Sequence, residues 1–227
     1  MPEVLHLRVP VLRRGEHTVL TDVDLRIGRG SFQCIIGANG TGKTSLLRAM
    51  CGDFTDGVEA LTIDGHDAHG LDGAHLAALR AVLPQALAPN FPYTVRDVAS
   101  WGAFVHGGAR ADAVEAALER VGILALAERP VTALSGGEWA RVRIAQALLQ
   151  RPAVLFADEP DAALDRAASR GLFEMLAHSD QTVVAVTHDI DLARRHATHI
   201  IGLRGGRIEF QRPAAEVSAD DCEALWA

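Results

Sequence analysis

A glycine-rich octapeptide constrains this chain more than any other feature of its sequence. Residues 37–44 read GANGTGKT and match the pattern GxxxxGK[ST], in which glycines let backbone amides close around a phosphate. An apolar run, Phe32–Ile36, precedes the octapeptide and a helix-like segment, residues 45–50, follows it. A strand, a glycine-rich turn and a helix in this order predict an α/β fold with a phosphate-binding loop.

The residue types in this loop suit a nucleoside triphosphate bound with Mg²⁺. The helix that follows the loop adds its positive N-terminal end, and Lys43 neutralises the β- and γ-phosphate oxygens. Thr44 offers a hydroxyl to Mg²⁺. The alternative is a glycine turn without a ligand, against which the strand and helix on either side argue. We expect nucleotide contacts from Gly37, Ala38, Asn39, Gly40, Thr41, Gly42, Lys43, Thr44 and Ser45.

The rest of the chain predicts two additions to this core. Apolar and polar side chains alternate over residues 4–9 and 23–27, on either side of a turn at Arg14-Gly15, which indicates antiparallel strands. Apolar runs at residues 81–83, 154–157 and 183–186 alternate with helical patterns, as in a parallel sheet. Between Phe91 and Pro130 the pattern is helical only. We expect one domain, residues 1–227, with a helical lobe at about residues 86–134.

Composition and charge exclude several classes of protein. With 48% hydrophobic and 22% charged residues, the chain is expected to fold as an ordinary globular protein. Its apolar runs are far shorter than the ~20 residues that span a bilayer. Its first residues lack the basic and apolar regions of a secretory signal, so we expect a cytoplasmic protein. A net charge of −7 argues against a nucleic-acid partner.

Two acidic residues, Asp158 and Glu159, end the apolar run at residues 154–157. Ligands of open α/β sheets bind at the carboxyl ends of the strands. We expect Asp158 to hold Mg²⁺ and Glu159 to orient or deprotonate an attacking water molecule. The alternative is a solvated strand end without a chemical role.

The segment LSGGE at residues 134–138 opens a predicted helix that runs to about Gln150. By local rules it is a capping box, with Ser135 as the N-cap and Glu138 at the third helical position. It also places two glycine amides at a helix N-terminus, which would make a second anion site. Taken alone, the segment leaves both interpretations open.

In their order, these motifs resemble those of the nucleotide-binding subunits of ABC transporters, over essentially the whole chain. Residues 37–44 resemble the Walker A loop, residues 134–138 the signature motif, and Asp158 with Glu159 Walker B. Gln85 resembles the Q-loop glutamine, residues 162–165 the D-loop, and His188 the switch histidine. The resemblance implies the ABC ATPase fold: a P-loop NTPase core of mostly parallel sheet, an N-terminal antiparallel β subdomain and a helical lobe. It implies ATP as substrate and Mg²⁺ as cofactor.

The resemblance also implies a head-to-tail dimer. In that dimer Ser135, Gly136, Gly137 and Glu138 of one copy would close on the γ-phosphate that Lys43 of the other copy holds. Gln85 would join Thr44 and Asp158 as a ligand of Mg²⁺, Glu159 would be catalytic, and His188 would donate a hydrogen bond to the γ-phosphate.

Three positions depart from the family's usual pattern, one of them Trp139, which follows Glu138 where a polar residue is more usual. Arg14 stands where an aromatic residue usually stacks on adenine, and a guanidinium group can also stack on a base. Asp161 follows Glu159-Pro160 where threonine is common, and adds negative charge near the expected dimer seam.

Residues 81–85 and 91–98 resemble the ATPases of haem, siderophore and cobalamin importers, so haem or a related iron chelate is the expected cargo. The expected partners are a second copy, integral membrane permease subunits and, indirectly, a substrate-binding protein, at the cytoplasmic face of the cell membrane. Alternatives are an ATPase of a zinc or manganese importer or of an exporter, and an ABC ATPase that acts on DNA or the ribosome. A P-loop kinase or switch GTPase would explain residues 37–44 but not residues 134–138 or His188.

A stretch rich in histidine and aspartate lies at residues 66–75. It would be a metal or haem site only if its spacing matched a ligand set, which it does not. We therefore expect a polar loop that joins a strand at residues 61–63 to a helix at residues 74–79. A peripheral helix is expected at residues 215–226.

Overall fold

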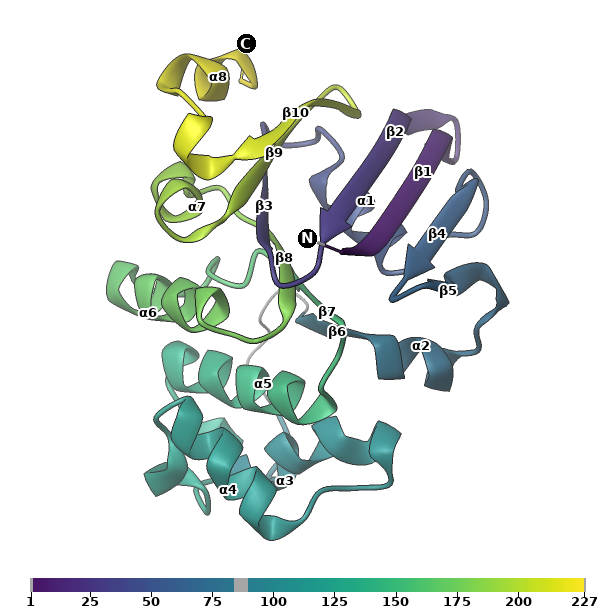
Figure 1. Cartoon of the computed structure of the whole chain (residues 1–227). Helices are drawn as coiled ribbons and strands as arrows, with labels where there is room; N and C mark the ends of the chain where they lie inside the picture. The colour runs from purple at the N-terminus through teal and green to yellow at the C-terminus, as the bar shows by residue number, and fades with distance from the viewer. Residues whose placement is uncertain (1, 84–89, 227) are drawn as a thin grey trace.

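Two β-sheets with a helix between them form the centre of the computed structural model, which describes residues 2–83 and 90–226 (Figure 1). The smaller sheet contains β2 (His17–Gly28), β1 (Glu3–Arg14), β4 (Ala60–Ile63) and β5 (His66–Asp67), and every neighbouring pair is antiparallel. The larger sheet contains, in order, β10 (Arg207–Pro213), β9 (His199–Arg204), β3 (Phe32–Ile36), β8 (Thr182–Val186), β7 (Val154–Asp158) and β6 (Arg80–Leu83).

Five strands of the larger sheet, β9, β3, β8, β7 and β6, are parallel, and only β10 pairs antiparallel, with β9. Every residue of β3 and β8 is buried, because helices or the other sheet cover both faces. Side chains in β3 alternate between two cores: Cys34 faces one and Ile35 the other. The predicted α/β fold, with a mostly parallel sheet and an N-terminal antiparallel β subdomain, is confirmed.

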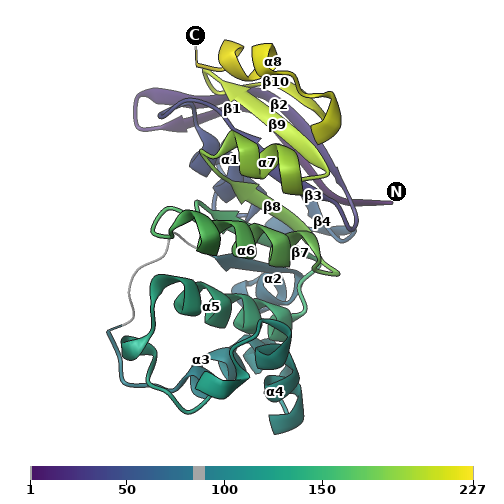
Figure 2. The ribbon, with the colours of Figure 1, turned by 90° about the vertical axis from the view of Figure 1, so that its left-hand side faces the viewer.

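Helix α1 (Lys43–Met50) follows β3 and lies between the sheets. Its Leu46, Leu47 and Met50 are buried in one core together with residues of β1, β2, β7 and β8. The opposite face of the larger sheet is covered by α5 (Gly136–Gln150), α6 (Arg166–Ala177) and α7 (Ile190–His196), as Figure 2 shows. Because the loop before α1 follows the carboxyl end of β3, it lies at the carboxyl edge of the larger sheet, on the side of the smaller sheet.

Helices α3 (Val95–Ser100) and α4 (Ala111–Arg120) pack on α5 at the end of the molecule farthest from the smaller sheet (Figures 1 and 2). The 3₁₀ segments η2 (Trp101–His106), η3 (Leu124–Leu126) and η4 (Val131–Ala133) connect them to α5. A capping box starts α3, with Thr94 as the N-cap and Asp97 as its partner. These elements form a helical lobe that joins the sheet through α5 and β6.

The histidine-rich stretch differs from the expected loop. Asp64 and Gly65 have positive φ angles of 51° and 77°, the backbone of a two-residue hairpin, so His66 and Asp67 form β5 against β4. Segment η1 (Ala68–Gly70) and helix α2 (Gly73–Leu79) follow. The Asp-Gly pair carried this signal in the sequence and was overlooked. No group of three or more His, Cys, Asp or Glu side chains that could hold a metal ion occurs in the described part of the chain.

The end of the chain packs beside β10. Segment η5 (Ala214–Glu216) leads to the short helix α8 (Ala219–Ala224), whose Cys222 is buried in the core shared with α5, α6 and α7. None of the helices described in residues 2–83 and 90–226 has the length and apolar character needed to cross a membrane.

Candidate nucleotide site

Two positions of the loop between β3 and α1 accept only glycine. Gly42 has a φ of 101°, and a Cβ there would lie 2.7 Å from the carbonyl oxygen of Val19. A Cβ on Gly37 would overlap the carbonyl oxygen of Leu203. The loop is thus held against β2 and β9, and its backbone turns tightly into the N-terminus of α1, the arrangement that receives phosphate groups.

The Lys43 ammonium group lies across this loop. Its Nζ donates hydrogen bonds of 2.9 Å to the carbonyl oxygens of Gly37 and Ala38, and the residue is only 6% exposed. Burial lowers the pKa of Lys43, while the carboxylates of Glu159 and Asp158 oppose that shift. The loop therefore carries a buried cation that faces two acids from the neighbouring strand end.

Thr44 and Asp158 meet although 114 residues separate them in sequence. Thr44 Oγ1 donates to Asp158 Oδ1 at 3.2 Å, which links the start of α1 to the end of β7. Burial raises the pKa of Asp158, and the hydrogen bond from Thr44 opposes the rise. A hydroxyl and a carboxylate side by side are oxygen ligands of the kind that Mg²⁺ prefers, so these residues fit that ion. Gln85, the third expected ligand, lies outside the described residues.

Glu159 and His188 are brought together by neighbouring strands. Glu159 follows β7 with a positive φ of 44°, and its N–H donates to the Val186 carbonyl oxygen at 3.2 Å. His188 follows β8, and its Nε2 lies 2.8 Å from Glu159 Oε1. A carboxylate and an imidazole in hydrogen-bond contact, beside the Lys43 loop, can position a water molecule and a phosphate oxygen.

Arg14 ends β1 and pairs with His17 across the turn at Gly15. Both residues are exposed at the tip of the hairpin. Further along β2, which His17 begins, Val19 is the residue whose carbonyl oxygen approaches Gly42. The hairpin that carries Arg14 therefore rises beside the glycine-rich loop, and its tip is open to a ligand held there.

Residues 135–138 form the capping box at the start of α5. Ser135 Oγ accepts from the Glu138 N–H at 3.3 Å, and Glu138 Oε2 accepts from the Ser135 N–H at 2.7 Å. A Cβ on Gly136 would lie 3.4 Å from the Ala163 carbonyl oxygen, so this helix start adjoins residues 162–165. The chain does not bring it onto its own phosphate loop: α5 starts beside the helical lobe, whereas α1 starts under the smaller sheet (Figure 1).

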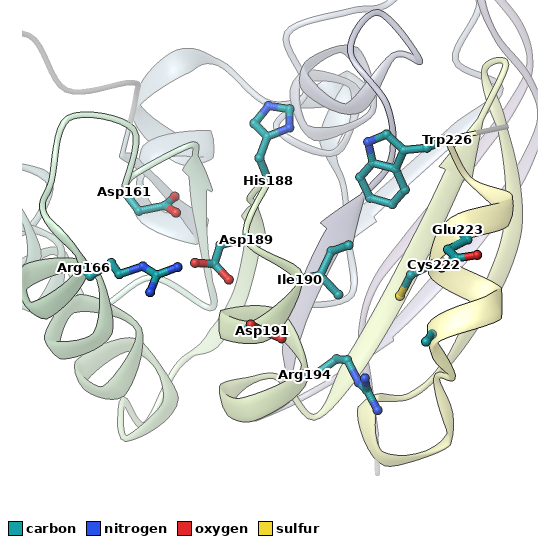
Figure 3. A pocket seen from close by; sticks show the side chains of 11 residues that line it. Asp161, Arg166, His188, Asp189, Ile190, Asp191, Arg194, Cys222, Glu223 and Trp226 are labelled. Carbon is teal, nitrogen blue, oxygen red and sulfur yellow. The ribbon is translucent and has the colours of Figure 1, made fainter.

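Thr187 is a residue that sequence reasoning missed. It is completely buried, and its Oγ1 donates to Asp161 Oδ2 at 3.1 Å while accepting from the Asp189 N–H at 3.0 Å. The only available signal was its place before His188. Asp161, His188 and Asp189 border a cavity of about 800 Å³, whose other wall includes Ile190 and Trp226 (Figure 3).

Comparison with known proteins places this site in context. The family model described as ABC transporter matches residues 20–162. The hemin import ATP-binding protein HmuV of Streptomyces coelicolor is 38% identical over 213 residues, which cover 90% of this chain and 76% of that protein. The protein of the same name from Burkholderia lata is 38% identical over 224 residues, covering 86% and 82%. A solved dimeric ATP-binding cassette bound to ADP and Pi is 26% identical, with a TM-score of 0.76, and covers 94% of this chain and 100% of that one.

Proposed function

Because this chain belongs to the ABC transporter family and is an ATP-hydrolysing subunit of that family, we propose that it powers the import of haem or a related iron chelate through separate permease subunits in the membrane. The observation that supports the site assignment is the meeting of Lys43, the Thr44–Asp158 pair and the Glu159–His188 pair at one edge of the sheet. Such subunits act from the cytoplasmic face of the cell membrane.

Hydrolysis follows from the chemistry of these side chains. The backbone amides of residues 37–45 and the Lys43 ammonium bind the phosphates of ATP, and the exposed Arg14 is available to stack on the base. Thr44, Asp158 and Gln85 are the residues that would hold Mg²⁺, and the ion would neutralise charge on the phosphates of ATP. Glu159 orients and deprotonates the attacking water, and His188 donates a hydrogen bond to the γ-phosphate.

A second copy completes the site. Residues 135–138 lie at a helix start that adjoins the chain's own residues 162–165 rather than its own phosphate loop. The N–H groups of Ser135 and Glu138 are engaged in the capping box, so the amides of Gly136 and Gly137 are the ones we propose for an anion held by another chain. The solved cassette with ADP and Pi is dimeric, which supports a dimer of this chain. We propose a head-to-tail dimer, in which residues 135–138 of one copy contact the γ-phosphate bound to the other.

The cargo proposal rests on two relatives with 38% identity whose names specify hemin import. Cargo chemistry lies in the permease and in a substrate-binding protein, so this chain need not contact haem.

The decisive experiment is capture of the permease. A Glu159→Gln chain, which binds ATP but hydrolyses it poorly, is incubated with membranes of the source organism and Mg–ATP, and the recovered proteins are identified by mass spectrometry. The matched control adds Lys43→Ala, which removes ATP binding. We expect a permease whose reconstituted complex takes up haem into vesicles with ATP. Recovery of a zinc or manganese permease, an exporter, ribosomes or DNA would overturn the cargo or the transport assignment.

A further inference from the structure

We propose that Asp161 is a positioning residue for ATP hydrolysis: through the Thr187 hydroxyl, its carboxylate holds His188 against Glu159. This inference rests on hydrolysis by this chain and is independent of the cargo. It concerns a position where the family commonly has threonine, so the acid is a feature of this sequence.

The contacts form a closed ring. Pro160 joins Glu159 covalently to Asp161, Asp161 Oδ2 accepts from Thr187 Oγ1 at 3.1 Å, and Thr187 precedes His188 in the chain. The ring closes where His188 Nε2 meets Glu159 Oε1 at 2.8 Å. Glu159 and His188 are therefore connected twice: directly by their own side-chain contact, and indirectly through Asp161 and Thr187.

Thr187 is suited to fix the backbone on both sides of His188. Its hydroxyl has one proton, which goes to Asp161, and it accepts the Asp189 N–H at 3.0 Å. Its own N–H donates to the Ile35 carbonyl oxygen at 3.3 Å, and the Asp189 side chain caps α7 by accepting from Leu192 N–H. Removal of the Asp161 carboxylate takes from the buried Thr187 hydroxyl the acceptor that its proton has in the folded chain.

Figure 3 shows how the two loops lie. Asp161 stands on the loop after β7, while His188 and Asp189 stand on the loop after β8, on the same side of the cavity. Arg166, at the start of α6, extends toward Asp189. The Asp161–Thr187 hydrogen bond links the side chains of these two loops. Thr187 immediately precedes His188, which contacts the Glu159 carboxylate.

The test compares kcat and KM for ATP in the full-length chain carrying Asp161→Ala, Asp161→Asn or Thr187→Val. Misplacement of His188 acts on the chemical step, so we expect Asp161→Ala to lower kcat by roughly 10- to 100-fold while KM changes little. Asp161→Asn keeps an acceptor for the hydroxyl and restores most of kcat. We expect kcat of the double variant Asp161→Ala/Thr187→Val to be no lower than kcat of the less active single variant. The control is Asp191→Ala, an acid on the same cavity wall but outside the ring, with unchanged kcat.

A second readout does not depend on turnover. The imidazole resonances of His188, assigned by their absence in His188→Ala, are followed in the Asp161→Ala protein by NMR. We expect them to shift while those of distant His66 and His106 stay in place, which also shows that the variant is folded. Wild-type kcat in Asp161→Ala, additive effects in the double variant, or unmoved His188 resonances would each overturn the proposal.

Discussion

At the scale of single residues, Asp161 is predicted to cost stability. Burial raises the pKa of this carboxyl, and the charges of Asp189 and Glu159 raise it further. A folded-state pKa above the unfolded value means that the folded chain holds the proton more tightly, so stability falls as pH rises through the folded pKa. Asp161→Asn should therefore raise the melting temperature at pH 7.5. The measurement is calorimetry without nucleotide.

Measurements of the same two proteins at progressively lower pH are the control, since a protonated Asp161 and an asparagine are both neutral. The difference in melting temperature should shrink as the pH falls, and a difference that stays constant or grows would contradict this cause. Sequence reasoning identified Asp161 as a departure but not its partner. The bond to Thr187 joins residues 26 positions apart, on loops that are neighbours only because β7 pairs with β8. The motifs at residues 37–44 were visible because a phosphate loop is continuous in sequence.

At the scale of elements, two capping boxes of the same chemistry allow the effect of a cap on stability to be measured apart from an effect on activity. Ser135 starts α5 with Glu138, and Ser218 starts α8 with Asp221. Replacing either serine with alanine removes an N-cap and should cost about 1 kcal/mol of the free energy of unfolding. Only Ser135→Ala should also lower ATPase activity, because only that helix start is proposed to meet the nucleotide. Urea unfolding and steady-state hydrolysis measure the two effects.

Equal losses of activity in the two variants would mean that residues 135–138 act only as a cap. The sequence predicted both the capping chemistry and the anion site at this segment, since both depend on residues within one helix turn. It was less informative for β5, where the backbone of Asp64-Gly65 and pairing with β4 decide the structure of a polar segment. Short polar strands lack both the apolar alternation and the continuous apolar runs by which the other strands were predicted.

At the scale of the whole molecule, the order of the six strands was the part that the sequence left open. Apolar runs identify buried strands but not their neighbours, and β3 lies between β8 and β9, which come more than 140 residues later. That order places the loops after β3, β7 and β8 at one edge, and so creates contacts such as Thr44–Asp158 and Glu159–His188. The signature segment is left on another part of the surface, so in the proposed dimer the site depends on a second chain.

This dependence predicts complementation between two inactive variants. A Lys43→Ala chain lacks the phosphate-binding ammonium, and a Ser135→Arg chain blocks the helix start that contacts the partner's nucleotide. In a head-to-tail dimer of one with the other, the intact Lys43 faces the intact Ser135 at one of the two sites. Random pairing of equal amounts should restore about a quarter of the wild-type number of sites. The measurement is ATPase activity of the mixture against each variant alone and against the double variant, which cannot complement itself. A mixture as inactive as its components would show that each chain builds its site without the signature segment of a partner.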